Sequence, residues 1–329
     1  MPERTYTERI NTLYTTTWQA RKKDVINVAF QVTPFWKLMS DKGNLQAEDG
    51  GRFIEQPLFV KKNETVKFLG KGGTVSLNDN DPMTTIYYDW KYLAGNVTRY
   101  WTDEQKNKGK KKLISMVTAK VDGLKDSIAD DLEIALNAAS PGSLDFHSLP
   151  QLISTTPSTG TLAGMARSKT YMQNVATSMS GYSFITYGRK YMSKMFNDCS
   201  KYGEGLKRFP TLILTDQATY ELYEDEVAEI HQVYVTPGQA GTQVGDLGFG
   251  DLLFKGRPIT WSPEATAGEI RFINTNFMKF TYDPAEFFDM TEWKSIPNQP
   301  KDRVAQIVLA GNLCLTAPQR QGVLYLVAE

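Results

Sequence analysis

The sequence LISMVTAKVDGLKDSIADDLEIAL, residues 113–136, carries the strongest periodic signal in the chain. Its apolar side chains recur every three or four positions, which is the spacing of one face of an amphipathic helix. That stripe consists of Leu113, Val117, Val121, Leu124, Ile128, Leu132 and Ala135. The pattern predicts a helix over residues 105–137, about 50 Å long at ~1.5 Å per residue. Because the stripe is narrow, we expect this helix to lie along a flat body and to pack on one side only.

Two predicted strands precede the helix, at residues 52–60 and 84–92. In the second strand an apolar face alternates with a more polar one, as in a half-buried strand. The apolar face consists of Ile86, Tyr88, Trp90 and Tyr92. The segment between the strands contains Gly-Lys-Gly-Gly at 70–73 and Asn-Asp-Asn-Asp-Pro at 78–82, which are turn signals. We therefore expect one long projecting hairpin, and an isolated two-stranded hairpin is only marginally stable in water. Part of its apolar face is expected to lie on another subunit, while Tyr92 packs on the body of its own chain.

The rest of the chain predicts a mixed α+β fold. Residues 1–50 are mostly polar, have no independent core and are interpreted as an arm. Beyond the long helix, apolar spacing predicts another helix at 182–201 and a third that Asp216 begins. Short predicted strands occupy 211–214, 252–254, 258–261, 270–273, 304–315 and 322–327.

Composition narrows the function classes. The chain has 329 residues, with 37 basic and 37 acidic side chains, a balance that is not typical of a dedicated nucleic-acid binder. No apolar run approaches the roughly 20 residues of a membrane span, and the polar start is unlike a secretory signal. Cys199 and Cys314 are the only cysteines, which favours a reducing compartment such as the cytoplasm.

Motifs that would carry chemistry are incomplete. His147 and His231 are the only histidines; neither lies in a metal-ligand spacing, and both are interpreted as ordinary surface or interface residues. The glycines at 70–73 lack the rest of a phosphate loop, and the acidic turn at 78–81 lacks the later glutamate of a calcium loop. Cys199 is expected to be a packed thiol. The sequence predicts no catalytic, cofactor-binding or metal-binding residue.

A run of lysines precedes the helix stripe, at Lys106, Lys108, Lys110, Lys111 and Lys112. One interpretation is a solvated helix end. The other is contact with DNA or with an acidic patch on a neighbouring subunit. Cations near a helix N-terminus oppose the helix dipole, which favours an external anionic partner.

The order of these elements resembles that of the major capsid proteins of tailed bacteriophages, the Hong Kong 97-type fold. The resemblance divides the chain into an N-terminal arm (1–50), an extended loop (51–100), a spine helix with the start of a peripheral domain (101–155), a mainly axial domain (156–295) and a return to the peripheral domain (296–329). Phe209 to Asp216, FPTLILTD, resembles the entry into the axial domain. Residues 249–259, FGDLLFKGRPI, resemble a stretch common in these chains.

The resemblance implies a structural subunit, without catalysis or cofactor, that assembles into hexamers and pentamers of an icosahedral head around double-stranded DNA. Contact with neighbouring subunits is expected at Lys61, Lys67, Ile86, Tyr88 and Trp90 of the extended loop. The resemblance also implies that the protein is located in the virion, which is assembled in the bacterial cytoplasm. A portal is an expected partner, and a decoration protein is an optional one. Because only some fifty residues precede the loop, a separate scaffolding protein is also expected. The same fold serves encapsulins, which enclose an enzyme cargo, and this is the alternative. An enzyme of small, defined oligomeric state is a third.

Overall fold

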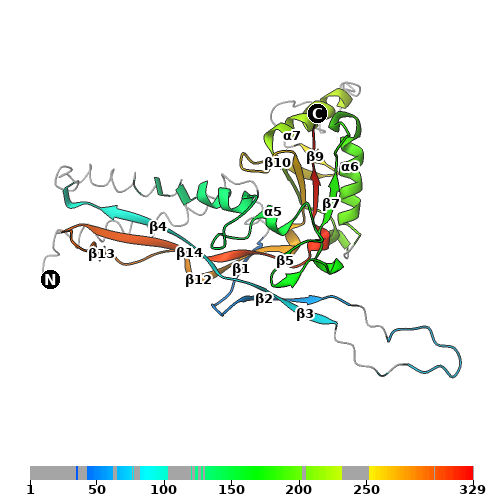
Figure 1. Cartoon of the computed structure of the whole chain (residues 1–329), viewed down its shortest axis with the longest axis horizontal. Helices are drawn as coiled ribbons and strands as arrows, with labels where there is room; N and C mark the ends of the chain where they lie inside the picture. The colour runs from blue at the N-terminus through cyan, green and yellow to red at the C-terminus, as the bar shows by residue number, and fades with distance from the viewer. Residues whose placement is uncertain are drawn as a thin grey trace, which may run out of the picture.

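The computed structural model describes residues 35, 43–61, 65–75, 77, 82–102, 120, 123–124, 127–128, 130–201, 205–231, 252–299 and 301–328. Two sheets organise this part of the chain, and a two-stranded hairpin projects from it (Figure 1). No helix in the described ranges combines the length and apolar character that a membrane crossing needs.

A six-stranded mixed sheet forms one body, with strand order β7-β15-β11-β8-β10-β9. Its strands are β7 (Val175–Ser178), β15 (Gly322–Tyr325), β11 (Glu269–Ile273), β8 (Leu212–Thr215), β10 (Arg257–Trp261) and β9 (Leu253–Phe254). Helices α6 (Phe184–Cys199) and α7 (Gln217–His231) lie beside this sheet (Figure 1). Met192, Phe196 and Phe272 pack between the helices and the sheet. The division of the chain into an arm, an extended loop, a peripheral domain and an axial domain stays a prediction.

A five-stranded sheet forms a long ribbon that extends to the left in Figure 1. Its strands are β1 (Leu45–Ala47), β12 (Met278–Met290), β14 (Arg303–Leu315), β13 (Lys294–Ser295) and β4 (Lys91–Arg99). β14 pairs antiparallel with β12 along one edge, and with β4 from Lys91↔Gly311 to Arg99↔Arg303 along the other. β1 adds a parallel strand to β12, so the end of the predicted arm joins this sheet.

The predicted long helix is helical at 120, 123–124, 127–128 and 130–137, while its start near residue 105 lies outside the described residues. Ile128, Leu132 and Leu136 are buried, and Leu124 is partly buried. The helix approaches β4 at Gly95, where an added Cβ would lie 3.0 Å from the Cδ1 of Leu124. Glycine at this position therefore allows helix and strand to pack closely.

The hairpin prediction is confirmed, because β2 (Ile54–Phe59) pairs antiparallel with β3 (Met83–Tyr88) from Ile54↔Tyr88 to Phe59↔Met83. The expected single strand at 84–92 is wrong in one respect. β3 ends at Tyr88, and the chain then enters β4, which belongs to the five-stranded sheet.

The remaining elements are short. They are α5 (Leu149–Leu152), β5 (Thr161–Leu162), β6 (Met165–Ala166), η1 (Thr170–Met172), η2 (Gly205–Arg208), η3 (Thr275–Phe277) and η4 (Pro318–Arg320). The predicted helix at 182–201 and the predicted strands at 211–214, 258–261 and 270–273 are confirmed as α6, β8, β10 and β11. β12, thirteen residues long, was not predicted.

Candidate assembly surface

The base of the hairpin is buried within its own chain. Ile54, Ile86 and Tyr88 have no exposed surface and belong to the main apolar cluster. The turn between β5 and β6 supports the same region, since the backbone N–H of Tyr87 donates to the carbonyl of Ala163 at 3.2 Å. The hairpin is thus rooted in the body.

Polar contacts fix the point where the hairpin joins the body. The Tyr88 hydroxyl donates to the carbonyl of Leu315 at 2.9 Å and accepts from its N–H at 3.1 Å. The Asn312 amide donates from Nδ2 to the carbonyl of Asp89 at 2.7 Å. Its Oδ1 accepts from the backbone N–H groups of His147 and Leu313, both at 2.9 Å. We call Tyr88, Asp89, His147, Asn312 and Leu315 the Asn312 clamp.

The burial of the hairpin base corrects three expectations from the sequence. Ile86 and Tyr88 were expected to contact a neighbouring subunit, but both side chains are fully covered by their own chain. His147 was interpreted as an ordinary surface or interface residue, yet it is half-buried and lies edge-on to Tyr88, with ring centroids 5.4 Å apart. The sequence did contain a sign of such a polar contact: Asn312 lies within the apolar run VLAGNLCL, and a buried asparagine must find hydrogen-bond partners.

Two other aromatic residues of the same predicted face differ from each other. Trp90 is half-buried and packs against the main cluster, so only part of it is available to a neighbour. Tyr92 was expected to pack on the body, but it is 66% exposed. The reason is the break after Tyr88, since Tyr92 lies in β4, whose alternation places it on the outer side.

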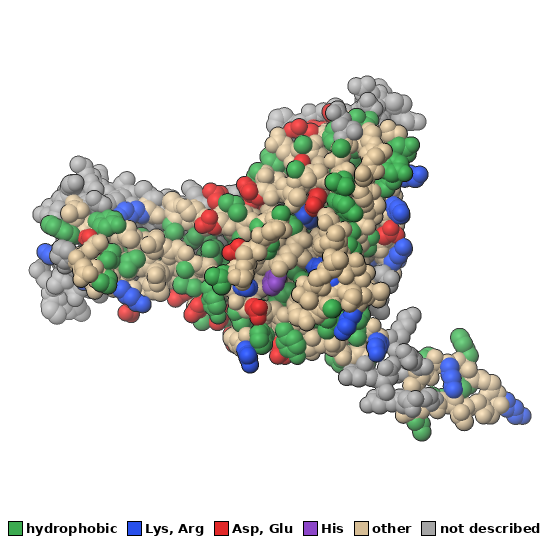
Figure 2. Space-filling model, in the orientation of Figure 1, with side chains coloured by type: hydrophobic (Ala, Val, Ile, Leu, Met, Phe, Trp, Pro, Cys, Tyr) green, Lys and Arg blue, Asp and Glu red, His purple; other side chains and the backbone are tan. Residues whose placement is uncertain are grey.

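The outer part of the hairpin is apolar and exposed. Val66 is 82% exposed, Phe68 is fully exposed and Leu77 is 98% exposed; Phe59, at the end of β2, is 79% exposed. Figure 2 shows hydrophobic and basic side chains together on this projecting part. We call Phe59, Val66, Phe68, Leu69, Val75 and Leu77 the loop-tip surface. Lys61 and Lys67 are exposed in the same segment, and their contact with a neighbour stays a prediction.

Apolar side chains on a projection have no core of their own to enter. Several large, strongly exposed apolar side chains on one segment indicate an interaction site more strongly than a single one does. The loop-tip surface is therefore the best candidate for contact with a second chain. Lys108, Lys110, Lys111 and Lys112 lie outside the described residues, so their contact with DNA or a neighbour stays a prediction.

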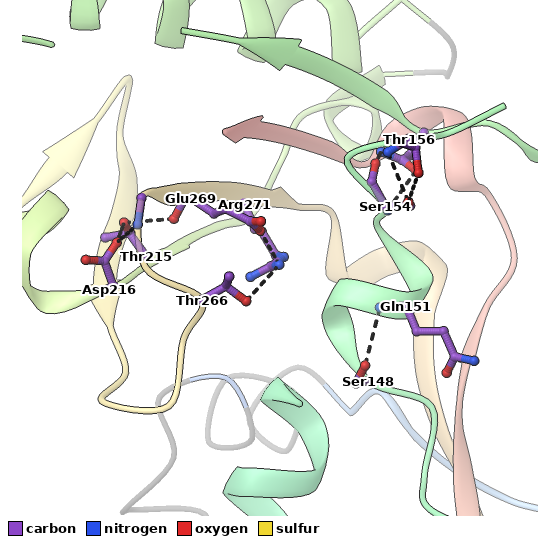
Figure 3. Close-up of polar contacts among 11 residues, drawn as sticks. Ser148, Gln151, Ser154, Thr156, Thr215, Asp216, Thr266, Glu269 and Arg271 are labelled. Atoms are coloured by element: carbon purple, nitrogen blue, oxygen red, sulfur yellow. Dashed lines mark hydrogen bonds and ion pairs between the residues drawn. The ribbon is translucent and has the colours of Figure 1, made fainter. Parts of the chain in front are cut away.

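Charged groups of the six-stranded sheet and of the start of α7 have structural partners. Arg271, 2% exposed, pairs with Glu269 and donates to Thr266 at 3.3 Å (Figure 3). Burial lowers the pKa of Arg271 and raises that of Glu269, and in each case the partner's charge opposes the shift. Asp216 accepts from the N–H groups of Thr219 at 3.3 Å and Gly268 at 3.1 Å, which caps α7 as the sequence predicts.

Glu133 connects the long helix to the six-stranded sheet. Its Oε1 accepts a short hydrogen bond from the hydroxyl of Ser262, just after β10, and another from Nδ2 of Asn137 at 3.1 Å. Burial raises the pKa of the Glu133 carboxyl, and the negative charges of Glu264 and Asp130 add to this. The hydrogen bond from Ser262 acts in the opposite direction, and the carboxyl at the junction still stays protonated to a higher pH than an exposed glutamate does.

The described residues contain no group of three or more His, Cys, Asp or Glu side chains placed to hold a metal ion. Cys199 and Cys314 are free and buried, and burial raises the pKa of Cys314 to about 12. A cavity of about 120 Å³ lies where β2 meets η4. This volume is below the roughly 300–1,000 Å³ of small-molecule sites.

No protein-family model and no curated protein matches this sequence. Solved structures do match its fold. A protein of the cyanophage A-1(L) capsid aligns with a TM-score of 0.57 and 12% identity, over 87% of this chain and 91% of that one. A chain of the satellite phage P4 procapsid aligns with a TM-score of 0.51 and 10% identity, over 93% of this chain and 91% of that one. A capsid chain of an empty GTA particle aligns with a TM-score of 0.52 and 11% identity, over 87% of this chain and 89% of that one. The chain therefore has the Hong Kong 97-type fold of these capsid structures.

Proposed function

We propose that this chain is a major capsid protein, a structural subunit that assembles with copies of itself into an icosahedral phage head. The loop-tip surface carries the proposal, because it places strongly exposed apolar side chains on a projection. Burying such a side chain is worth roughly 1.5–3 kcal/mol, and a shell repeats the same contact at every subunit. The fold supports the proposal, since capsid structures align with nearly the whole chain.

In this function the subunits form hexamers and pentamers, and the chain catalyses no reaction and holds no cofactor. Double-stranded DNA is the enclosed content, contacted weakly and without sequence preference, in keeping with the balanced charge of the chain. The place of action is the virion, after assembly in the host cytoplasm. A portal, a scaffolding protein and a decoration protein are the further partners that a phage head implies.

Electron microscopy of the purified full chain, combined with sedimentation over a range of concentration and salt, tests the proposal. We expect closed shells or ring-shaped capsomers. A compact monomer or small fixed oligomer under all conditions would contradict it. The content of particles from the native source separates the alternatives, since double-stranded DNA supports a phage head and a co-purifying enzyme supports an encapsulin.

A further inference from the structure

The protonation state of His147 follows from the contacts of Asn312. Two backbone N–H groups, those of His147 and Leu313, donate to Oδ1 of Asn312. Its other terminal atom, Nδ2, must then be the amide nitrogen, and one of its hydrogens is donated to the carbonyl of Asp89. Nδ1 of His147 lies 2.7 Å from the same Nδ2. The second amide hydrogen therefore points at Nδ1, which must accept it as an unprotonated nitrogen.

A protonated imidazole does not fit this arrangement. Both ring nitrogens of an imidazolium are donors, so an N–H of His147 would face an N–H of Asn312. Turning the Asn312 amide around would not restore the contacts. Oδ1 would then no longer accept from the two backbone N–H groups, and Nδ2 would no longer donate to the Asp89 carbonyl. Protonation must instead move the imidazole or the amide.

Charged and aromatic groups surround His147 on several elements. The Tyr88 ring of β3 stands at 85° to the imidazole. Asp89, after β3, attracts an imidazolium, while Lys91 of β4 repels it and donates to the carbonyl of Ser143. Burial is the strongest influence and lowers the pKa of His147, while the charge of Asp89 acts in the opposite direction.

We propose that His147 is a proton-operated latch: the Asn312 amide holds the Asp89 carbonyl at the base of the hairpin only while the imidazole is neutral. Protonation disturbs the amide that binds the Asp89 carbonyl, directly beside the last residue of β3. The second anchor, between Tyr88 and Leu315, contains no group that titrates near neutral pH. The hairpin therefore loosens at its junction with β4 without leaving the body. The latch regulates the direction of the loop-tip surface, so its role in assembly rests on the proposed function.

Hydrogen–deuterium exchange of the full chain, read by mass spectrometry, tests the latch directly. Rates at pH 7.5 and pH 5.0 are corrected for the intrinsic pH dependence of exchange. We expect peptides covering Asp89 and Leu313 to lose protection at the lower pH, by up to roughly tenfold for each pH unit below the imidazole pKa. Peptides of α6, remote from the clamp, serve as an internal reference.

The variant His147→Asn offers a carbonyl oxygen in place of Nδ1 and cannot be protonated, so the pH response should disappear. The matched control is His231→Asn, which removes the only other histidine and should keep the response. An unchanged response in His147→Asn, or none in the wild type, would overturn the latch. If the variant does not fold, the wild-type titration still decides. The measurement does not need a shell, so its failure is distinguishable from a failure to assemble.

Discussion

The Tyr88 hydroxyl forms hydrogen bonds with two backbone groups of one residue: it donates to the carbonyl of Leu315 and accepts from its N–H. Both partners lie in the main core, where water is excluded. Burial also raises the pKa of Tyr88, so the phenol stays protonated and able to donate at any physiological pH. At the scale of single residues, this hydroxyl and the Asn312 amide fix the hairpin to the body.

Replacing Tyr88 by Phe should destabilise the chain by about 1–3 kcal/mol, because it leaves the buried N–H and carbonyl of Leu315 without a partner. Urea unfolding measures this change in the free energy of unfolding. Tyr87→Phe is the matched control, since its ring lies on the exposed side of β3, and a change within about 0.5 kcal/mol is expected. Equal effects of the two substitutions would show that the hydroxyl of Tyr88 is not an anchor.

Glu133→Gln should stabilise the chain at neutral pH relative to the wild type. The native pKa of Glu133 is raised, so its contribution to stability is fully present at acid pH and is lost as pH rises through the native pKa. Glutamine keeps Oε1 as acceptor for Ser262 and Asn137 and carries no charge. Urea unfolding at pH 4 and pH 8 should give a difference that grows with pH.

The exposed Asp131 of the same helix provides the control, and Asp131→Asn should not reproduce this pH dependence. If Glu133→Gln is less stable than the wild type at pH 8, the buried carboxyl stabilises the fold as an anion and the expected direction of the change is wrong.

At the scale of elements, periodic patterns made the long helix and the hairpin predictable. β12 escaped prediction because Asp283-Pro284-Ala285-Glu286 is typical of a turn, whereas in the structure it is an irregularity between Tyr282 and Phe287 in a continuous strand. β4 escaped because Gly95 and Asn96 have low strand propensity, and only the contact of Leu124 explains the glycine. The Asn312 clamp could not be predicted because its residues are far apart in the sequence.

The loop-tip surface should tolerate charge without loss of stability. Phe68→Asp removes a side chain that is fully exposed in the single chain, so the free energy of unfolding should change by less than about 0.5 kcal/mol. Assembly should nevertheless fail or weaken, as measured by the sedimentation of particles. Leu144→Asp alters another exposed apolar residue, 81% exposed and outside the hairpin, and should affect assembly less. A Phe68→Asp protein that assembles like the wild type would remove Phe68 from the interface.

At the scale of the whole molecule, the hairpin divides into a base that belongs to its own chain and a tip that does not. Among the described residues, the last backbone hydrogen bond between its two sides before the turn at 70–73 is from the N–H of Val60 to the carbonyl of Pro82, at 2.9 Å. Beyond it, the described side chains are almost all exposed. Cutting the hairpin at this point therefore removes the tip, which the proposed function places against a neighbouring subunit. It keeps the base, which is part of the subunit's own fold.

Joining Val60 to Pro82 through Asn-Gly, a preferred two-residue hairpin turn, keeps every β2–β3 pair and the whole Asn312 clamp. It removes the apolar tip, from Val66 to Leu77. We expect circular dichroism and urea unfolding close to the wild type, because the described side chains among those deleted are not part of the core. We expect no closed shells in electron micrographs of the same sample. Replacing residues 61–81 by a Gly-Ser segment of equal length separates loss of the apolar side chains from loss of length. Intact shells from both variants would show that the hairpin is not an inter-subunit contact, whereas unfolded protein would show that the tip belongs to its own core.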